Sequence, residues 1–160
     1  MKLRSAEPSD MPFLWQCLAI AAREPTAAAA EATPIAAKYL NGWPRPGDFG
    51  IIAEQNGRPA GAAWARLFAP SEHPFVHVDA RTPEIATAVL PECRGRGLGG
   101  HLLTALAEQA RPTCNGLCLN VRADNPAVRL YERQGYRHLP GSELVNRTGG
   151  LSFGMVLRFR

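Results

Sequence analysis

Apolar side chains recur along this chain with two different periods. Between residues 13 and 21 they fall at helical spacing, and the same spacing returns after Gly100 in Leu102, Leu103, Leu106 and Ala110. Elsewhere they gather in short runs that Gly, Pro and Asn interrupt, a pattern typical of strands. The chain is therefore predicted to be a mixed α/β protein built from short elements.

The predicted elements follow one another without an internal repeat. Helices are expected at residues 13–21, 31–43, 98–110 and 125–134, and strands at residues 2–5, 49–54, 59–68, 85–90, 116–121, 136–139 and 151–159. Asn56-Gly57 is expected to close a hairpin, Gly61 to mark a bulge, and Pro8-Ser9-Asp10 to cap the first helix. Residues 75–78 are expected to be extended, and residues 140–150 to form a flexible loop. The order gives a partly antiparallel sheet of about seven strands flanked by about four helices.

Composition fits one folded domain. The 160 residues, 46% of them hydrophobic and 20% charged, can bury a sizeable core, so residues 1–160 are expected to form a single domain. The formal net charge is +4, and 16 of the 18 basic residues are arginines. Because these arginines are scattered, the charge does not indicate a nucleic-acid-binding protein. A few of them are available for a polyanionic cofactor.

The four cysteines, Cys17, Cys93, Cys114 and Cys118, suggest free thiols in a reducing cytoplasm. No His or Cys cluster stands beside Cys114 and Cys118 to complete a zinc site, so no metal is expected. Cys93 has no evident His partner, which disfavours covalent catalysis through its thiol. Neither a signal peptide nor a membrane-spanning run is expected.

The most informative stretch is the apolar run ending at Leu90 and the turn Arg94-Gly95-Arg96-Gly97-Leu98-Gly99-Gly100 that follows it. Glycines let backbone N–H groups approach a ligand closely. The next helix adds free N–H groups and the positive end of its dipole, and the two arginines add charge. Strand, turn and helix together predict a site for an anion such as a pyrophosphate.

A dinucleotide is one ligand to weigh for this turn. Gly95, Gly97 and Gly100 match the G-x-G-x-x-G fingerprint, and Asp124 lies where a ribose-binding acid would be expected. The context disfavours this interpretation, because residues 91–94 separate the turn from its strand. In addition, the 60 residues after Gly100 end in strands rather than in repeated strand–helix units.

A second match is more extensive. The pattern Arg94-x-x-Gly97-x-Gly99 is similar to the Q/R-x-x-G-x-G/A signature of the GNAT superfamily of acyl-CoA-dependent N-acetyltransferases. Residues 125–136, NPAVRLYERQGY, resemble the family segment N-x-x-A-x-x-L-Y-x-x-x-G-F/Y, with every key position filled. The resemblance is strong over residues 84–138. It implies an α/β (α+β) GNAT-like fold, in which the fourth and fifth strands splay apart and admit the pantetheine arm of acetyl-CoA.

The resemblance also implies which residues bind this cosubstrate. Backbone N–H groups of the turn should hold the pyrophosphate, and they belong to Arg94, Gly95, Arg96, Gly97, Leu98 and Gly99, extending to Gly100 and His101. Backbone groups of Val89 and Leu90 should meet the pantetheine arm and supply a donor for the oxyanion. Asn125 matches the family position that helps to bind the pantetheine region, and it also suits the N-cap of a helix.

Two side chains are candidates for proton transfer. Tyr131 matches the tyrosine proposed in the family to protonate the leaving thiolate, and its alternative role is that of a core aromatic. Glu84 is the candidate base that takes a proton from the amine, directly or through one water. Its alternative role is that of a solvated charge at a strand end. Asp79, His77 and Glu72 are weaker substitutes, and many family members use a water chain instead.

The function implied by the resemblance is transfer of an acetyl group from acetyl-CoA to a primary amine, by direct attack in a ternary complex. The alternatives are a non-catalytic acyl-CoA-binding or regulatory domain and an acyltransferase that uses a different acyl-CoA. The acceptor, a small molecule or a protein, is left open. Its specificity is expected in residues 24–43 and 140–150, which contain no dense acidic cluster. Homodimers are common in the family, so a homodimer is one expected assembly.

Overall fold

The computed structural model describes residues 1–160 and contains five α-helices, three 3₁₀ turns and eight strands. The predicted mixed α/β class is confirmed. Two compact units make up the chain, the first from Met1–Arg66 and Ala86–Leu106, the second from Leu67–Ile85 and Ala107–Arg160. The chain passes from one unit to the other within strand β4 and within helix α4. The single domain expected for residues 1–160 stays a prediction.

The first unit is built on the predicted hairpin. Strands β2 (Phe49–Gln55) and β3 (Arg58–Arg66) pair antiparallel, and β1 (Lys2–Ser5) adds to the other edge of β2. Strand β4 (Glu84–Val89) follows β3 in the strand order. Asn56 and Gly57 have φ angles of +52° and +75°, the positive values that a tight two-residue hairpin turn requires at both central positions.

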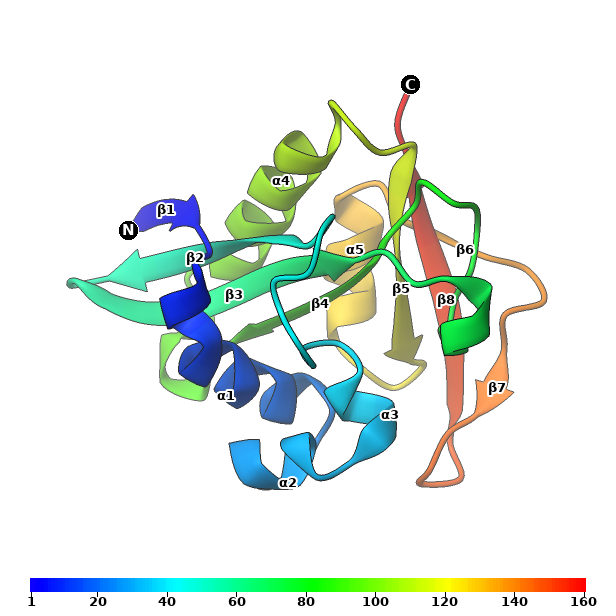
Figure 1. Ribbon diagram of the computed structural model, residues 1–160, viewed down its shortest axis with the longest axis horizontal. Coiled ribbons are helices and arrows are strands. Elements are labelled where there is room, and N and C mark those ends of the chain that lie inside the picture. Colours follow the sequence, from blue (N-terminus) through cyan, green and yellow to red (C-terminus); the bar gives the residue numbers. More distant parts are fainter. The chain divides into compact units, whose positions relative to one another are not determined.

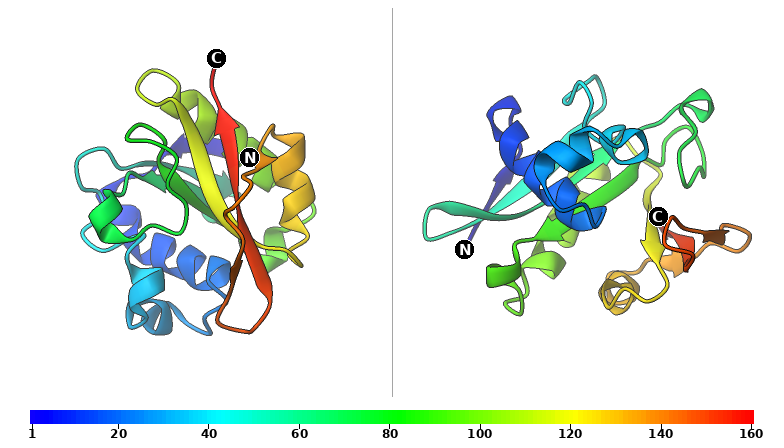
Figure 2. Two further views of the ribbon diagram at one scale, coloured as in Figure 1. Left: turned by 90° about the vertical axis from the view of Figure 1, so that its right-hand side faces the viewer. Right: turned by 90° about the horizontal axis from the view of Figure 1, so that it is seen from below.

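Helices lie on both faces of this part of the sheet. The helices α1 (Met11–Ala21), α2 (Ala27–Glu31) and α3 (Pro34–Ala37) lie on one face, and the first turns of α4 (Leu98–Ala110) lie on the other (Figures 1 and 2). Large side chains that are fully buried come from all of these layers and include Leu14, Leu18, Leu40, Ile52, Trp64 and Leu102. The apolar periodicity of residues 13–21 and 98–110 therefore marks faces that are buried.

The single helix predicted for residues 31–43 is wrong. Within that range only α3 and the last residue of α2, Glu31, are helical. Thr33 is extended, with φ −104° and ψ 105°, as a residue before proline prefers, and this conformation separates the two helices. Pro34 occupies the first helical position of α3, where its missing N–H is harmless. Ile35 on α3 is 41% exposed, whereas Tyr39 and Leu40, which follow the helix, are buried.

The second unit contains a long antiparallel pair of strands. Strands β5 (Gly116–Arg122) and β8 (Leu151–Arg158) pair along the whole of β5, and α5 (Ala127–Arg133) lies beside them (Figure 2). Two short strands, β6 (Arg137–His138) and β7 (Leu144–Val145), also pair with β8. Strand β7 lies in the stretch predicted to be a loop, which raises the number of strands from about seven to eight.

The predicted strand at residues 136–139 is shorter than expected, because β6 spans two residues and is soon followed by Pro140, which has no N–H to donate to a ladder. Residues 75–78 form no strand, although Val76 packs into a core with Cys118 and Val156. At the start of β4, Glu84 pairs parallel with Cys118. The splay between the fourth and fifth strands stays a prediction. No helix combines the length and the apolar character needed to cross a membrane.

Candidate acyl-donor site

The glycine-rich turn has the geometry that its sequence predicts. After β4 the chain passes through Leu90 and a 3₁₀ turn, η3 (Pro91–Cys93), and α4 begins at Leu98. Gly95 and Gly97 both have φ +79°, a left-handed conformation that side chains with a Cβ rarely adopt. These two glycines therefore allow the sharp path that brings the chain from the end of a strand into the start of a helix.

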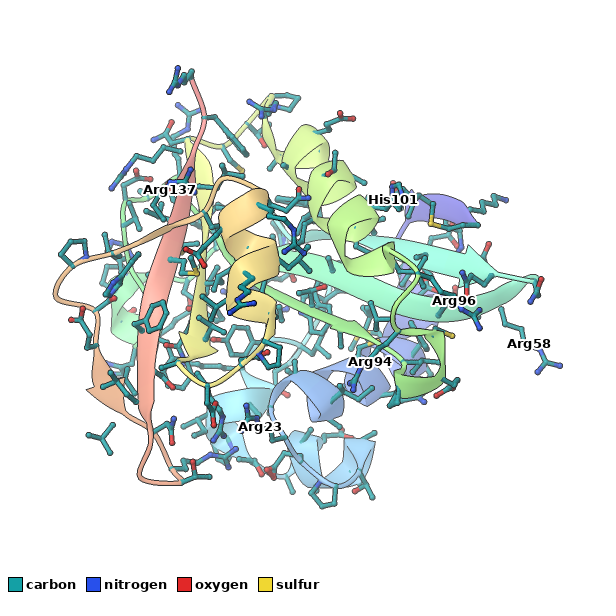
Figure 3. All side chains as sticks on the ribbon, turned by 180° about the vertical axis from the view of Figure 1, so that it is seen from behind. Arg23, Arg58, Arg94, Arg96, His101 and Arg137 are labelled. Carbon is teal, nitrogen blue, oxygen red and sulfur yellow. The ribbon has the colours of Figure 1, made fainter.

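The start of α4 presents donors to an anion. The hydrogen bond from His101 N to Gly97 O, 3.2 Å long, is the first helical bond, so the N–H groups of Leu98, Gly99 and Gly100 precede it. The positive end of the dipole of this 13-residue helix is at the same place. The loop before α4 carries the exposed side chains of Arg94 and Arg96 (Figure 3). Backbone donors, helix dipole and two cations thus surround one short loop.

The neighbouring hairpin fixes this loop. Leu90 N donates to Ala60 O at 2.8 Å, and Arg96 Nη1 donates to Gln55 Oε1 at 2.9 Å. No feature of the sequence predicts Gln55 as a partner of the loop. The Asn56-Gly57 turn predicts the hairpin, but its pairing with a loop 41 positions further along depends on the order of the strands.

Close packing at Gly61 fixes the strand that leads into the loop. A Cβ atom at Gly61 would lie 3.0 Å from Ala88 O and 3.1 Å from Leu102 Cδ1, so any larger residue would push β4 or α4 away. The β2–β3 register also shifts here, because Ala53 pairs with Gly61 and Glu54 with Pro59. The irregularity predicted at Gly61 is therefore confirmed.

In the second unit, Glu84 is buried. The residue is 2% exposed, and its Oε1 atom accepts a hydrogen bond of 3.4 Å from Val76 N. The alternative of a solvated strand-end charge is therefore wrong. Burial together with the negative charges of Glu84 and Asp79 raises the pKa of the neighbouring Cys118 thiol far above its usual range. Cys118 is thus a protonated, unreactive thiol, and all four cysteines are free.

The three weaker candidates for the catalytic base are not buried as Glu84 is, and two of them bond to the local backbone. Asp79 Oδ1 accepts hydrogen bonds from Arg81 N at 2.7 Å and from Thr82 Oγ1 at 2.8 Å. Glu72 Oε1 accepts from Ala69 N at 2.8 Å, and His77 is exposed. Both carboxylates therefore stabilise turns of the local backbone, and among the carboxylates considered only Glu84 is buried. No group of His, Cys, Asp and Glu side chains is arranged to hold a metal ion.

Tyr131 lies on α5 and is 8% exposed. Burial raises the pKa of its phenol to about 12, so the hydroxyl stays protonated at neutral pH. Its ring packs edge-on against Tyr136, with 5.9 Å between the centroids. The Tyr136 hydroxyl is buried without a hydrogen-bond partner in the protein. Tyr131 is therefore both a core aromatic and a protonated phenol, which makes its two predicted roles compatible.

Asn125 lies just before α5. Its Oδ1 accepts a hydrogen bond of 2.9 Å from Ala127 N, the first residue of that helix. This contact satisfies one of the free N–H groups at the helix start from one residue before the N-cap, which is Pro126 rather than the predicted Asn125. The amide Nδ2 remains a donor of two hydrogens, separate from the atom that stabilises the helix.

The sequence that carries these features matches the model of a known protein family. The model described as the acetyltransferase (GNAT) family matches residues 14–136, which include the loop, Asn125 and Tyr131. The chain belongs to the GNAT acetyltransferase family. By this membership it is an acyl-CoA-dependent acetyltransferase, and the dinucleotide interpretation of the Gly95–Gly100 loop is not supported. No curated protein matches the chain.

Solved structures described as acetyltransferases share the fold over nearly the whole chain. A ribosomal-protein-alanine N-acetyltransferase from Brucella melitensis is 25% identical, with a TM-score of 0.75 over 99% of this chain and 100% of that one. A protein from Salmonella typhimurium, solved with its cofactor acetyl-CoA, is 20% identical, with a TM-score of 0.74 over 99% and 94%. A mutant of spermidine N-acetyltransferase from Vibrio cholerae is also 20% identical, with a TM-score of 0.68 over 99% and 95%.

Proposed function

We propose that this GNAT protein transfers an acetyl group from acetyl-CoA to a primary amine by direct attack in a ternary complex. The observation that carries the proposal is the loop before α4. Two glycines at φ +79° lead into free helix N–H groups beside Arg94 and Arg96, an arrangement suited to a pyrophosphate. Backbone groups of Val89 and Leu90, at the end of β4, are proposed to meet the pantetheine arm.

The proposed roles of the side chains follow from the needs of the reaction. The amine must lose a proton before its nitrogen attacks the thioester carbon, and Glu84 is the proposed acceptor of that proton, directly or through water. The new C–N bond forms as the C–S bond breaks, and a backbone N–H at the end of β4 stabilises the oxyanion. The Tyr131 phenol donates a hydrogen bond to the leaving sulfur, which departs as the thiolate, and Asn125 contacts the pantetheine region through Nδ2.

Residues 24–43 and 140–150 are proposed to select the acceptor amine. Neither stretch contains a dense acidic cluster, which disfavours a polycationic acceptor. Acetyl-CoA consumption across a panel of amines distinguishes the enzyme from a non-catalytic acyl-CoA-binding domain. The same panel with longer acyl-CoA donors tests the acyltransferase that prefers another donor. The four free cysteines are compatible with the proposed cytoplasmic location.

A thermal-shift titration tests the donor site. Acetyl-CoA and CoA should both raise the melting temperature, NADH should not, and at a hundred times Kd the added stability should be about 2.7 kcal/mol. Gly97→Ala should remove the shift, because φ +79° is strained for alanine and the loop must change its path. A shift with NADH, or none with either CoA species, would contradict the proposal.

Gly47→Ala is the matched control for the loop variant. Gly47 has φ +91° and lies outside the loop, and an added Cβ would meet nothing within 4 Å. At Gly97 the nearest contact would be an ordinary one, His101 Cδ2 at 3.9 Å. Both substitutions should therefore cost a similar free energy of unfolding, about 1–2 kcal/mol, through backbone strain alone. Only Gly97→Ala should abolish the shift with acetyl-CoA.

A further inference from the structure

A buried ion pair lies at the end of β3 in the first unit. Arg66, the last residue of β3, and Asp48 approach each other to 2.7 Å, and the side chain of each is 1% exposed. Taking two charges out of water is costly, and apolar residues of similar volume often stabilise a fold at least as well as a buried ion pair does. The contribution of this pair is therefore sought in what it positions rather than in stability.

Arg66 holds the chain between α3 and β2, residues 38–48, which we call the α3–β2 connector. Its Nε atom donates to Asp48 Oδ1 at 3.1 Å, and Nη2 donates to Asp48 Oδ2 at 2.7 Å. The third nitrogen, Nη1, donates to Lys38 O at 2.9 Å and to Asn41 O at 2.7 Å. One guanidinium thus joins both ends of the connector to the end of β3 (Figure 1).

Further hydrogen bonds fix the connector between its ends. Trp64 Nε1 donates to Tyr39 O at 3.2 Å, and Asp48 Oδ2 also accepts from Arg45 N at 2.7 Å. Trp64 and Arg66 point to the same side of β3, because they are two residues apart on a strand, and each is 1% exposed. The path of the connector is therefore set by two buried side chains of β3.

The first part of the connector, up to Trp43, belongs to the stretch proposed above to select the acceptor amine. Residues that recognise a substrate must be held within about 0.5 Å of the productive geometry by a rigid support. The helix before the connector, α3, has four residues, and helices shorter than about 12 residues are marginal by themselves. This part of the chain therefore depends on β3 for a fixed position.

We propose that Arg66 and Asp48 are positioning residues for the acceptor amine, which fix the α3–β2 connector as one wall of the acceptor site. The proposal rests on the proposed function. Both residues act through the connector and neither touches the reacting atoms. The loop proposed to hold the pyrophosphate is fixed by other bonds, from Leu90 N to Ala60 O and from Arg96 to Gln55. Loss of the ion pair should therefore affect the amine and leave the binding of acetyl-CoA intact.

The double variant Arg66→Met with Asp48→Leu tests this assignment. It replaces both charges with apolar side chains, so the protein should remain folded, which thermal unfolding checks. The variant lacks the donors to Lys38 O and Asn41 O. The KM for an amine that the parent protein acetylates should rise about tenfold, while kcat and the Kd for acetyl-CoA should change less than twofold. Hydrogen exchange of the backbone amides of residues 38–48 should become about tenfold faster.

Arg66→Lys gives the same comparison with the charge kept. A lysine ammonium carries its three donors on one nitrogen and does not reproduce the fork that reaches a carboxylate and two carbonyls at once. The KM for the amine should therefore rise by an intermediate factor, about threefold, again with an unchanged Kd for acetyl-CoA.

Arg4→Met with Asp10→Leu is the matched control. It removes the same two charges from the same unit, where Arg4 and Asp10 approach each other to 2.8 Å away from the connector. This variant should keep the parent KM for the amine. An unchanged KM in both Arg66 variants, or an equal rise in the control, would overturn this proposal alone. If the parent protein binds no acetyl-CoA and acetylates no amine, the proposed function fails as well.

Discussion

At the scale of single residues, the surroundings of Tyr131 change the chemistry expected of it. Its pKa of about 12 lies roughly 3.5 pH units above that of an ordinary thiol, which is about 8.5. Complete proton transfer from this phenol to a thiolate is therefore unfavourable. A hydrogen bond from the protonated phenol to the departing sulfur avoids that difficulty, and it stabilises the negative charge as the C–S bond breaks.

Tyr131→Phe should lower kcat on the order of a hundredfold and leave the KM for acetyl-CoA almost unchanged, because the lost hydrogen bond acts on the leaving group. Steady-state kinetics with an active amine would measure this. Tyr136→Phe is the control, since it removes a neighbouring hydroxyl that has no partner in the protein. That variant should keep its kcat and gain about 1 kcal/mol of stability. An unchanged kcat in Tyr131→Phe, with chemistry limiting turnover, would exclude the proposed role.

Asp10 has a structural role that differs from the helix cap expected of it. Its side chain makes no capping bond to α1. Instead, its two carboxylate oxygens accept hydrogen bonds of 2.8 Å from Arg4, and Oδ2 also accepts one of 2.7 Å from Glu7 N. The hydrogen bonds from Arg4 lower the pKa of Asp10 below its ordinary value of 3.8. Asp10 thus joins β1 to the turn before α1.

Asp10→Asn should reduce the free energy of unfolding by about 1–2 kcal/mol at pH 7, because it removes a charge-assisted pair. A carboxyl whose folded pKa is lowered stabilises the fold above its unfolded pKa of 3.8, and this stabilisation is lost as pH falls through the folded pKa. Urea unfolding at pH 7 should therefore give a lower free energy of unfolding for the variant than for the parent protein. In acid, the two free energies of unfolding should become equal. A difference of equal size at both pH values would contradict the assignment.

At the scale of elements, the parts that the sequence predicts well are those fixed by neighbouring residues. The Asn56-Gly57 turn and the Gly95 and Gly97 turns depend on local backbone angles, and all were predicted. The end of α3 depends on distant partners instead. Arg66 Nη1 donates to Lys38 O and Asn41 O, at 2.9 and 2.7 Å, and these bonds take carbonyls that a longer helix would use. The sequence around residue 40 contains no sign of a partner 25 or more positions away.

The same distinction applies to the candidate site. The order of residue types predicts the loop before α4 because strand, glycines and helix are consecutive. The burial of Glu84 was not predicted, because it depends on Val76 and Cys118, which other parts of the chain bring to it.

The two proposed roles of Asn125 depend on different atoms of its side chain, so substitutions can test them separately. Oδ1 stabilises the start of α5, and Nδ2 is proposed to contact the ligand. Asn125→Asp should keep the oxygen that accepts from Ala127 N, so α5 and the overall stability should change little. The variant lacks the Nδ2 donor, so the KM for acetyl-CoA should rise severalfold if Nδ2 contacts the pantetheine region. Asn125→Ala should show the same rise in KM together with a loss of about 1 kcal/mol in unfolding free energy. An Asn125→Asp variant with unchanged kinetics would leave Asn125 as a helix cap only.

At the scale of the whole molecule, the chain connectivity bears on whether residues 1–160 unfold as one domain. Neither compact unit is a continuous stretch of sequence, because β4 and α4 each contribute residues to both. Unfolding one unit therefore disrupts a strand and a helix on which the other also depends. This arrangement favours a single cooperative unfolding transition, which is usual for chains of this length.

Two buried thiols allow the unfolding of each unit to be followed separately. Cys17 on α1 is in the first unit and Cys118 on β5 is in the second, and both are almost completely buried. Burial raises the pKa of Cys17 to about 12 and that of Cys118 further, so neither thiol should react with iodoacetamide while its unit is folded. Pulsed alkylation along a urea series, read by mass spectrometry, should then give the same midpoint for both cysteines.

The fluorescence of Trp15, Trp43 and Trp64 provides an independent measure, because all three tryptophans belong to the first unit. Its midpoint should coincide with the alkylation midpoint of Cys118 in the second unit, and saturating acetyl-CoA should move both midpoints by the same amount. Alkylation of Cys118 at a urea concentration that leaves the tryptophan signal native would mean that the second unit unfolds alone. In that case the chain would contain two separately unfolding units, and the single domain expected from its length and composition would be wrong.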